Sequence, residues 1–152
     1  WFLEKAMAGG GISINYGAHS LDKICYLTQS DIAWATGSCT YLQPGTDVDG
    51  SAQMLLRTSS GISASISLCG YSVVPIDETM LFFANGSLRL HTGSDLSVTC
   101  GIGYETVDTS SYPNAFEAQW ADFISGVRAG RILYCDGTYG ASIVRTIELL
   151  YH

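Results

Sequence analysis

The sequence lacks the concentrated positive charge that a nucleic-acid surface requires. Only 7 of its 152 residues are Lys or Arg, against 14 Asp or Glu, and the formal net charge is -7. A protein that displaces counterions from phosphates gathers its basic residues on one face, whereas here they are scattered. No apolar run approaches the ~18 residues of a membrane span, and there is no basic-then-apolar leader. The sequence therefore predicts a soluble, cytoplasmic protein with neither nucleic acid nor membrane as a partner.

Cysteine pairs and metal-ligand spacings are missing as well. The 5 cysteines form no C-x-x-C pair and leave one unpaired under any disulfide scheme, which predicts buried thiols in a reducing compartment. The histidines lie too far apart to suggest zinc, so we expect no metal site. No nucleophile elbow, H-E-x-x-H motif or P-loop is present. Gly101-Ile102-Gly103 predicts a loop between strands rather than a dinucleotide site, because Thr106 stands where a third glycine is needed.

The composition that is present describes a folded chain. A hydrophobic fraction of 47% and 9 tyrosines indicate much buried surface, and 152 residues suit one domain with one core. We assign residues 1–152 to a single domain. The sequence opens at Trp1 without an initiator Met and soon reaches Gly9-Gly10-Gly11. We therefore expect a piece of a longer protein, truncated at the start of this domain.

Hydrophobic spacing predicts the secondary structure. Apolar residues recur at three- and four-residue intervals over residues 12–27, which favours a helix, and its few charged positions indicate that it is covered on most sides. Alternating patterns favour strands. Alternation directs Ile32 and Trp34 to the same face of the first strand, and Ile62 to the same face as Ile66 in the third. The predicted strands are residues 32–41, 51–58, 62–71, 78–83, 87–91, 95–100 and 104–107.

Two helices close the chain. Asn114, with Glu117 three residues later, is typical of a helix N-terminus, and an apolar stripe follows as far as Gly130. A last helix, starting at Asp136 or Thr138, is expected to bury Ile143, Val144, Ile147, Leu150 and Tyr151. Strands grouped together and helices kept apart predict an α+β fold, a large and mostly antiparallel open sheet with helices packed on one face.

The outer face of the predicted sheet has small side chains. Ser63, Ser65, Ser67 and Cys69 share one face of the third strand. This face predicts a homo-oligomer joined sheet face to sheet face, although the alternation alone would also suit a solvated sheet.

One group of polar residues stands out on the first helix. Asn15 and His19 are four residues apart and Asp22 follows three residues later, so a helix brings them near one face. An imidazole is the side chain best suited to move a proton near pH 7. From the spacing alone, a buried His19 bonded to Asp22 as a structural lock is favoured over a catalytic one. Gly17 costs the helix ~1 kcal/mol relative to Ala, which predicts close packing against its backbone.

The same helix resembles the G-G-G-x-x-x-[D/N]-x-G-x-H-x-x-D signature of the glucose-fructose oxidoreductase / inositol dehydrogenase / rhizopine catabolism (Gfo/Idh/MocA) family. Its matching residues are Gly9-Gly10-Gly11, Asn15, Gly17, His19 and Asp22. Residues 49–71, 78–90 and 116–151 are similar to further family motifs in the expected order. The resemblance covers only the family's C-terminal α+β domain, since the dinucleotide fingerprint and the catalytic lysine motif of its N-terminal Rossmann domain are missing from the sequence.

This resemblance implies the substrate-binding domain of an NAD(P)-dependent oxidoreductase that acts on a sugar, polyol or related cyclic alcohol. His19 would exchange a proton with the substrate hydroxyl while NAD or NADP, held by the missing Rossmann domain, takes hydride from the same carbon. We expect the fragment alone to bind no cofactor and to be inactive. Its expected partners are the substrate, the Rossmann domain and further copies of the chain.

Two more residues are candidates for the site. Asn15 stands where the family often has a catalytic Asp, and an amide can orient a hydroxyl but cannot accept its proton. Tyr71 ends a strand whose family counterpart points toward the substrate, so it is a candidate for substrate binding. Two alternative functions remain open at this point: an NAD-dependent glycosidase of the same family, and a noncatalytic oligomerisation or binding domain in which His19 is structural.

Overall fold

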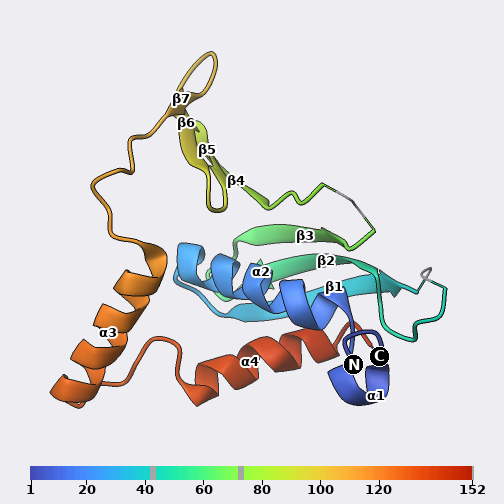
Figure 1. Ribbon diagram of the computed structural model, residues 1–152. Coiled ribbons are helices and arrows are strands. Elements are labelled where there is room, and N and C mark those ends of the chain that lie inside the picture. The colour runs from blue at the N-terminus through green and yellow to red at the C-terminus, as the bar shows by residue number, and fades with distance from the viewer. Residues whose placement is uncertain (42–43, 72–73, 152) are drawn as a thin grey trace. The chain divides into compact units, whose positions relative to one another are not determined.

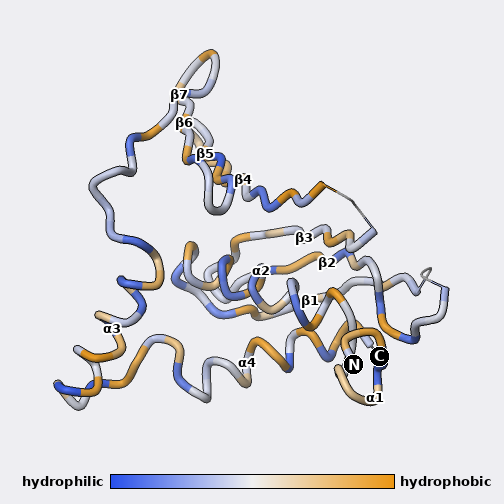
Figure 2. The backbone as a smooth tube through the Cα atoms, in the orientation of Figure 1, coloured by the Kyte–Doolittle hydropathy of each residue, from blue (hydrophilic) through white to orange (hydrophobic). Residues whose placement is uncertain are grey.

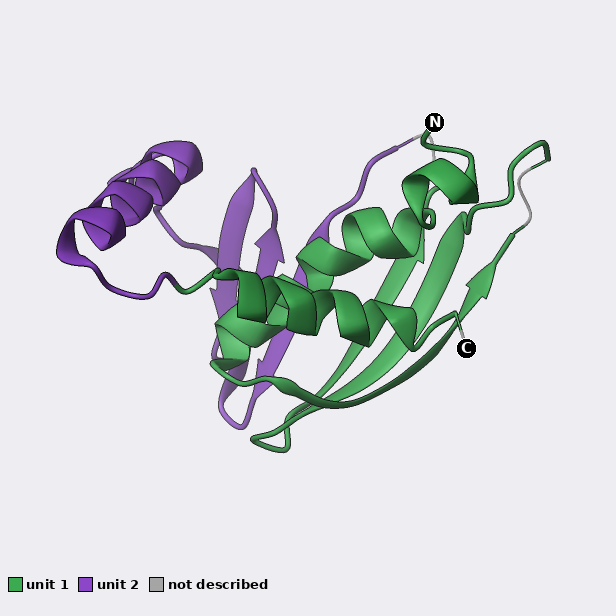
Figure 3. Cartoon of the chain, turned by 90° about the horizontal axis from the view of Figure 1, so that it is seen from below, with its two compact units in different colours: residues 1–72, 134–152 green, residues 73–133 purple. Residues whose placement is uncertain are grey.

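The structure is a computed structural model that describes residues 1–41, 44–71 and 74–151. Its contacts divide the chain into two compact units, residues 1–72 with 134–152 and residues 73–133 (Figure 3). The hydrophobic core that the structure describes lies entirely in the first unit. The assignment of residues 1–152 to one domain stays a prediction.

The first unit is a three-stranded antiparallel sheet with helices on one face (Figure 1). Helix α2 contacts β2, β3 and α4, and α2 and α4 lie side by side against the sheet in two views (Figures 1 and 3). The strand order is β1-β2-β3. The elements are α1 Lys5–Ala8, α2 Ile12–Thr28, β1 Ile32–Thr40, β2 Ser51–Thr58, β3 Ser63–Cys69 and α4 Gly137–Glu148.

The core forms where three apolar patterns meet. Helix α2 buries a row of residues spaced by four, Ser13, Gly17, Leu21 and Cys25, which a 3.6-residue period places on one side of the helix. Strands β2 and β3 alternate as predicted, so that Met54, Leu56 and Ile66 face the helices. Ile143 and Ile147 of α4 complete the cluster.

Two alternation predictions were wrong at strand ends. The pairing of β1 with β2 shifts register between Ile32 and Trp34, and such a bulge moves the side chains before it to the opposite face. Ile32 therefore packs against the core, while Trp34 is exposed. Ile62 lies in the turn before the start of β3 and its side chain is exposed, although its backbone is hydrogen-bonded to Thr58.

The prediction for α4 also needs correction. Val144 is exposed although it follows buried Ile143 directly. Leu150 and Tyr151 pack on the core from beyond the end of the helix at Glu148. The buried side of α4 is thus narrower than the apolar stripe in its sequence.

The second unit is a separate four-stranded antiparallel sheet in the order β4-β5-β6-β7, followed by a helix. Its elements are β4 Glu78–Phe83, β5 Gly86–His91, β6 Asp95–Thr99, β7 Glu105–Thr106 and α3 Ala115–Ala129. The α+β class and the antiparallel strands are confirmed. In the described ranges, however, the strands form two sheets rather than the one large sheet expected.

Local signals place the elements of this second unit. Asn114 caps α3 by accepting a hydrogen bond from the Phe116 amide, and Gly130 ends the helix with φ 63°, as predicted. Phe116 and Trp120 of the apolar stripe on α3 are exposed, and hydrophobic residues recur along this helix in Figure 2. The β4-β5 hairpin turns through Ala84 and Asn85.

The cysteines differ from the expectation of buried thiols. Cys25 is buried and Cys39 is half-buried, but Cys69, Cys100 and Cys135 are exposed. Their strand-end and loop positions place these three outside the core. Among the residues that the structure describes, no helix is long and apolar enough to cross a membrane.

The start of α2 is held by a carboxylate from another part of the chain. Asp49 is 2% exposed, and its side chain accepts hydrogen bonds from the Gly11 amide at 2.7 Å, the Ser13 amide at 2.8 Å, the Ser13 hydroxyl at 2.7 Å and the Tyr151 hydroxyl at 2.6 Å. Helix N-termini leave amide groups without partners, and Gly11 offers no side-chain cap. Asp49 therefore acts as the N-cap of α2 from a distance in sequence.

The triple glycine permits this arrangement. Gly9 adopts φ 80° at the end of α1, a conformation that glycine reaches without strain. A Cβ on Gly11 would collide with the Asp49 carbonyl oxygen, and one on Gly10 would collide with the Tyr151 hydroxyl. The glycines thus let the chain approach Asp49 closely enough to be capped.

We predict that Asp49→Asn lowers the free energy of unfolding by about 3 kcal/mol, because an amide removes the charge and turns an NH₂ donor toward other donors. Native-state hydrogen exchange at the α2 amides in the complete protein measures this loss. The matched control is Asp47→Asn, since Asp47 is exposed and accepts one bond from the Lys5 amide. Its expected cost is below about 1 kcal/mol.

The pH dependence tests the same carboxylate. Burial alone raises the pKa of Asp49, but its hydrogen bonds from Tyr151, Ser13 and Gly11 outweigh burial and lower the pKa. The stability it contributes is therefore present above its unfolded pKa and is lost as the pH falls through the folded value, below about 4. The stability difference between wild type and Asp49→Asn should shrink on acidification, and a constant difference would contradict the role.

Candidate functional site

The candidate site is the outward face of α2. Asn15 and His19 are both exposed, and at about 100° per residue they lie on the side of the helix opposite the buried row that begins at Ser13. One helical turn separates the two side chains. His19 makes no hydrogen bond or ion pair with another residue in the described ranges, so its imidazole is accessible from solvent and available to a ligand.

Asp22 points away from this pair. Its carboxylate accepts a hydrogen bond from the Tyr139 hydroxyl of α4 at 2.6 Å. The hypothesis of a buried His19 locked by Asp22 is therefore wrong: the imidazole is exposed and the carboxylate is engaged by another helix. The spacing of three residues predicted that His19 and Asp22 lie near one another on the helix. It could not show which neighbouring side chain would form a hydrogen bond with the Asp22 carboxylate.

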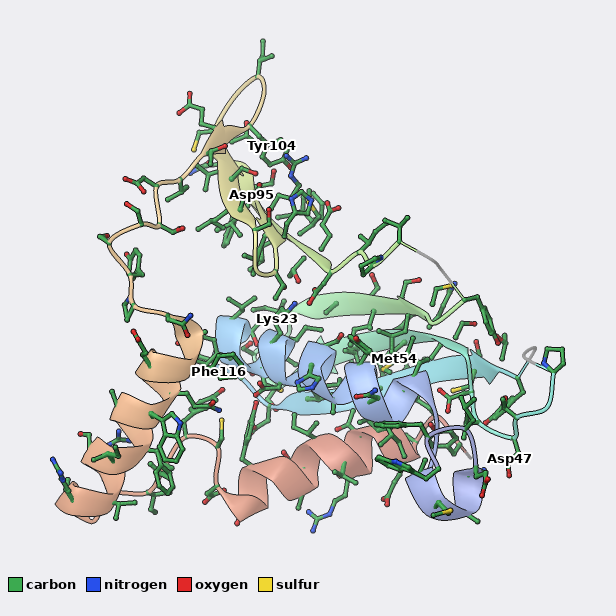
Figure 4. All side chains as sticks on the ribbon, in the orientation of Figure 1. Lys23, Asp47, Met54, Asp95, Tyr104 and Phe116 are labelled. Carbon is green, nitrogen blue, oxygen red and sulfur yellow. The ribbon has the colours of Figure 1, made fainter. Side chains whose placement is uncertain are left out.

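Gly17 packs as its position predicts. It is buried on the inner side of α2, and a Cβ there would lie 3.1 Å from the Met54 methyl and 3.4 Å from Leu68 Cδ1. Met54 of β2 is labelled in Figure 4. The absent side chain lets the helix lie close on β2 and β3. This contact fixes the depth at which α2 sits, and with it the position of the outward face.

Tyr71 lies near the start of α2, away from His19. Its ring covers Gly50, where any side chain would collide with it, and its hydroxyl donates to the Thr40 carbonyl oxygen at 3.4 Å. The preceding Gly70 contacts Ile12 at the start of α2, and His19 follows about 10 Å further along the helix axis. Substrate contact by Tyr71 stays a prediction.

Sequence reasoning missed the residues that hold the site in place. Asp49 and Tyr139 contact α2 from segments far away in the sequence. A signal for Asp49 was present, because a helix that starts at glycine without a capping side chain needs an acceptor from elsewhere. No comparable signal marked Tyr139.

The described residues do not form a dinucleotide cradle. Gly101-Ile102-Gly103 lies between β6 and β7 with Ile102 fully exposed, and no helix N-terminus follows it to receive a phosphate. In the same ranges, no group of three His, Cys, Asp or Glu side chains is arranged to hold a metal ion. Asn15 and His19 remain the candidate residues of the outward face of α2.

The profile of the GFO/IDH/MocA C-terminal domain matches residues 1–89. The chain belongs to the GFO/IDH/MocA family, and the match is to the family's C-terminal domain. No curated protein sequence matches the chain.

Solved structures share this fold over nearly the whole chain. The aldose-aldose oxidoreductase of Caulobacter crescentus, complexed with glycerol, is 22% identical with TM-score 0.87, over 99% of this chain and 47% of its own. Levoglucosan dehydrogenase, in complex with NADH and levoglucosan, is 17% identical with TM-score 0.81, over 97% and 51%. UDP-N-acetylglucosamine 3-dehydrogenase of Acidithiobacillus ferrooxidans is 19% identical with TM-score 0.74, over 88% and 44%.

These likenesses show the fold. The chain spans about half the length of the oxidoreductases it matches. Both the family resemblance and the α+β fold class are thereby confirmed.

Proposed function

We propose that this chain is the substrate-binding part of an NAD(P)-dependent oxidoreductase that acts on a sugar, polyol or related cyclic alcohol. The observation that carries the proposal is the position of His19, which is solvent-exposed on α2 and free of any protein partner in the described ranges. An acid/base group must reach the hydroxyl whose proton it moves. Relatives of the same fold bind glycerol or levoglucosan, which supports a hydroxylated substrate.

Each residue of the outward face has a separate task in this proposal. Nε2 or Nδ1 of neutral His19 accepts the proton from a substrate hydroxyl as the adjacent carbon is oxidised, and returns it in the reverse direction. The Asn15 amide, one turn away, hydrogen-bonds the same or a neighbouring hydroxyl and orients it. In the complete protein, a nicotinamide cofactor supplies the hydride acceptor. We expect the part of the complete protein outside this chain to hold that cofactor.

We predict that His19→Ala in the complete protein lowers kcat/KM about 100-fold or more, because loss of a general acid/base typically costs that much. Steady-state assays with NAD or NADP measure the change. The matched control is His91→Ala in the second unit, where His91 bonds Asp95 rather than a ligand, and it should stay within about threefold of wild type. If His19→Ala stays as active as that control, the chain is a noncatalytic binding domain.

The reaction type is tested by net cofactor reduction. We expect the complete protein, incubated with a panel of sugars, inositols and aryl glycosides, to reduce NAD or NADP in proportion to substrate consumed. An NAD-dependent glycosidase of the same family would instead cleave an aryl glycoside without net reduction, since the cofactor is restored in each turnover. Absorbance of the reduced cofactor and release of the aryl group distinguish the two outcomes.

Assembly is the second part of the proposal. The face of β1-β2-β3 that points away from α2 carries cross-strand rows of small and apolar residues, with Thr36, Leu55 and Ser65 in the central row. Leu55 is 58% exposed, and this face holds an open hollow of ≈ 390 Å³ lined by residues 36–38, 53–55 and 65–67. A second copy of this face, related by a two-fold axis, would fill such hollows and cover Leu55.

We predict that Leu55→Arg weakens this association about tenfold or more, because a two-fold axis brings the two arginines together in the centre of the interface. Light scattering of the complete protein at micromolar concentration measures the assembly. Ile62→Arg is the matched control, since Ile62 is 46% exposed but lies at the β2-β3 turn. An unchanged mass for Leu55→Arg would contradict the proposed interface.

A further inference from the structure

We propose that Tyr139 is a positioning residue that withholds the Asp22 carboxylate from His19, so that the imidazole stays unpaired and able to accept a substrate proton. This inference rests on the proposed role of His19. It goes further by assigning a task to a residue of another helix that touches neither substrate nor cofactor.

The first step is the competition for Asp22. Residues three apart on a helix are surface neighbours whose side chains can meet, and Asp22 follows His19 by three. Yet Oδ1 of Asp22 accepts from the Tyr139 hydroxyl at 2.6 Å, and no contact joins Asp22 to His19 in the described structure. The hydrogen bond from α4 thus engages one oxygen of the carboxylate and draws it toward α4.

The second step is that neighbouring residues hold Tyr139 in the position from which its hydroxyl reaches Asp22. Its ring lies 5.1 Å from that of Tyr134, which in turn meets Tyr26 of α2 edge-on at 5.6 Å. The Tyr139 amide donates to the capping carboxylate of Asp136 at 2.8 Å. Burial, followed by the bond to Asp22, raises the pKa of Tyr139, so its hydroxyl remains a donor at neutral pH.

The third step is the charge around His19. The charged side chains within one turn of it on α2 are Asp22 and Lys23. The residues that pack against α2 from β2, β3 and α4 are apolar and lie on its buried side, opposite His19, namely Met54, Leu56, Ile66, Ile143 and Ile147. Asp22 is therefore the carboxylate on α2 nearest to His19 in sequence, and its release would hold the imidazole in its protonated form to higher pH.

The test is the titration of His19 followed by NMR in the complete protein labelled with [¹³C]histidine, with the signal assigned by its loss in His19→Gln. We expect Tyr139→Phe to raise the midpoint of the His19 titration by about 0.3 pH unit, the size that an ion pair three residues apart on a helix gives. The acid limb of the pH–rate profile should move in the same direction. Asp22→Asn combined with Tyr139→Phe should restore the wild-type midpoint.

Tyr26→Phe is the matched control, because it removes a hydroxyl from the same aromatic group, at a ring that meets Tyr134 edge-on rather than Tyr139. It should leave the midpoint unchanged. An unchanged midpoint in Tyr139→Phe, or a rise that persists in the double variant, would overturn the inference.

A wild-type measurement covers the case in which Tyr139→Phe fails to fold. The ¹³C signal of the Asp22 carboxyl should show no inflection at the His19 midpoint, and an inflection there would also overturn the inference. Neither readout needs turnover. Failure of this inference is therefore distinguishable from failure of the proposed function, which the activity of His19→Ala decides.

Discussion

The arrangement of the first unit depends on one buried carboxylate. Asp49 accepts four hydrogen bonds that join the start of α2 to the last residues of the core, through Ser13 and Tyr151. A buried charge is tolerated only when its hydrogen bonds are satisfied. The folded chain must therefore bring all the donors of Gly11, Ser13 and Tyr151 within reach of the Asp49 carboxylate. The glycines before α2 allow this close approach, since a side chain at Gly10 would collide with Tyr151 and one at Gly11 would collide with Asp49.

The consequence for function is a helix with fixed depth and fixed rotation. Asp49 sets where α2 begins, Gly17 sets how closely it lies on the sheet, and Tyr139 engages its flank at Asp22. His19 lies between these contacts on the opposite side. The residue that we propose to move a proton is thereby held by a rigid element without being buried in it, and this combination is what an acid/base group requires.

Local patterns predicted most elements because their causes are local. The buried row of β3 follows from spacing alone, and so does the cap of α3 at Asn114. The prediction that α2 is covered on most sides was wrong, since Ile14, Tyr16, Tyr26 and Leu27 are exposed. The predictions failed where a neighbour overrode the pattern. A bulge moved Ile32 to the other face, and the narrow contact of α4 left Val144 in solvent. The division of the strands into two sheets likewise depends on which strands pair, a choice that no single strand encodes.

The sequence by itself determined the family signature, the helix that carries Asn15 and His19, and the α+β class, since all three are written in residue identity and spacing. Only the tertiary structure decided that His19 is exposed, that Asp22 bonds Tyr139 and that Asp49 caps α2. The physical reason is the range of the interactions. Periodicity reports contacts within one or two helical turns, whereas the partner of a polar side chain is chosen by whichever donor the fold brings nearest, here across 117 positions of the chain.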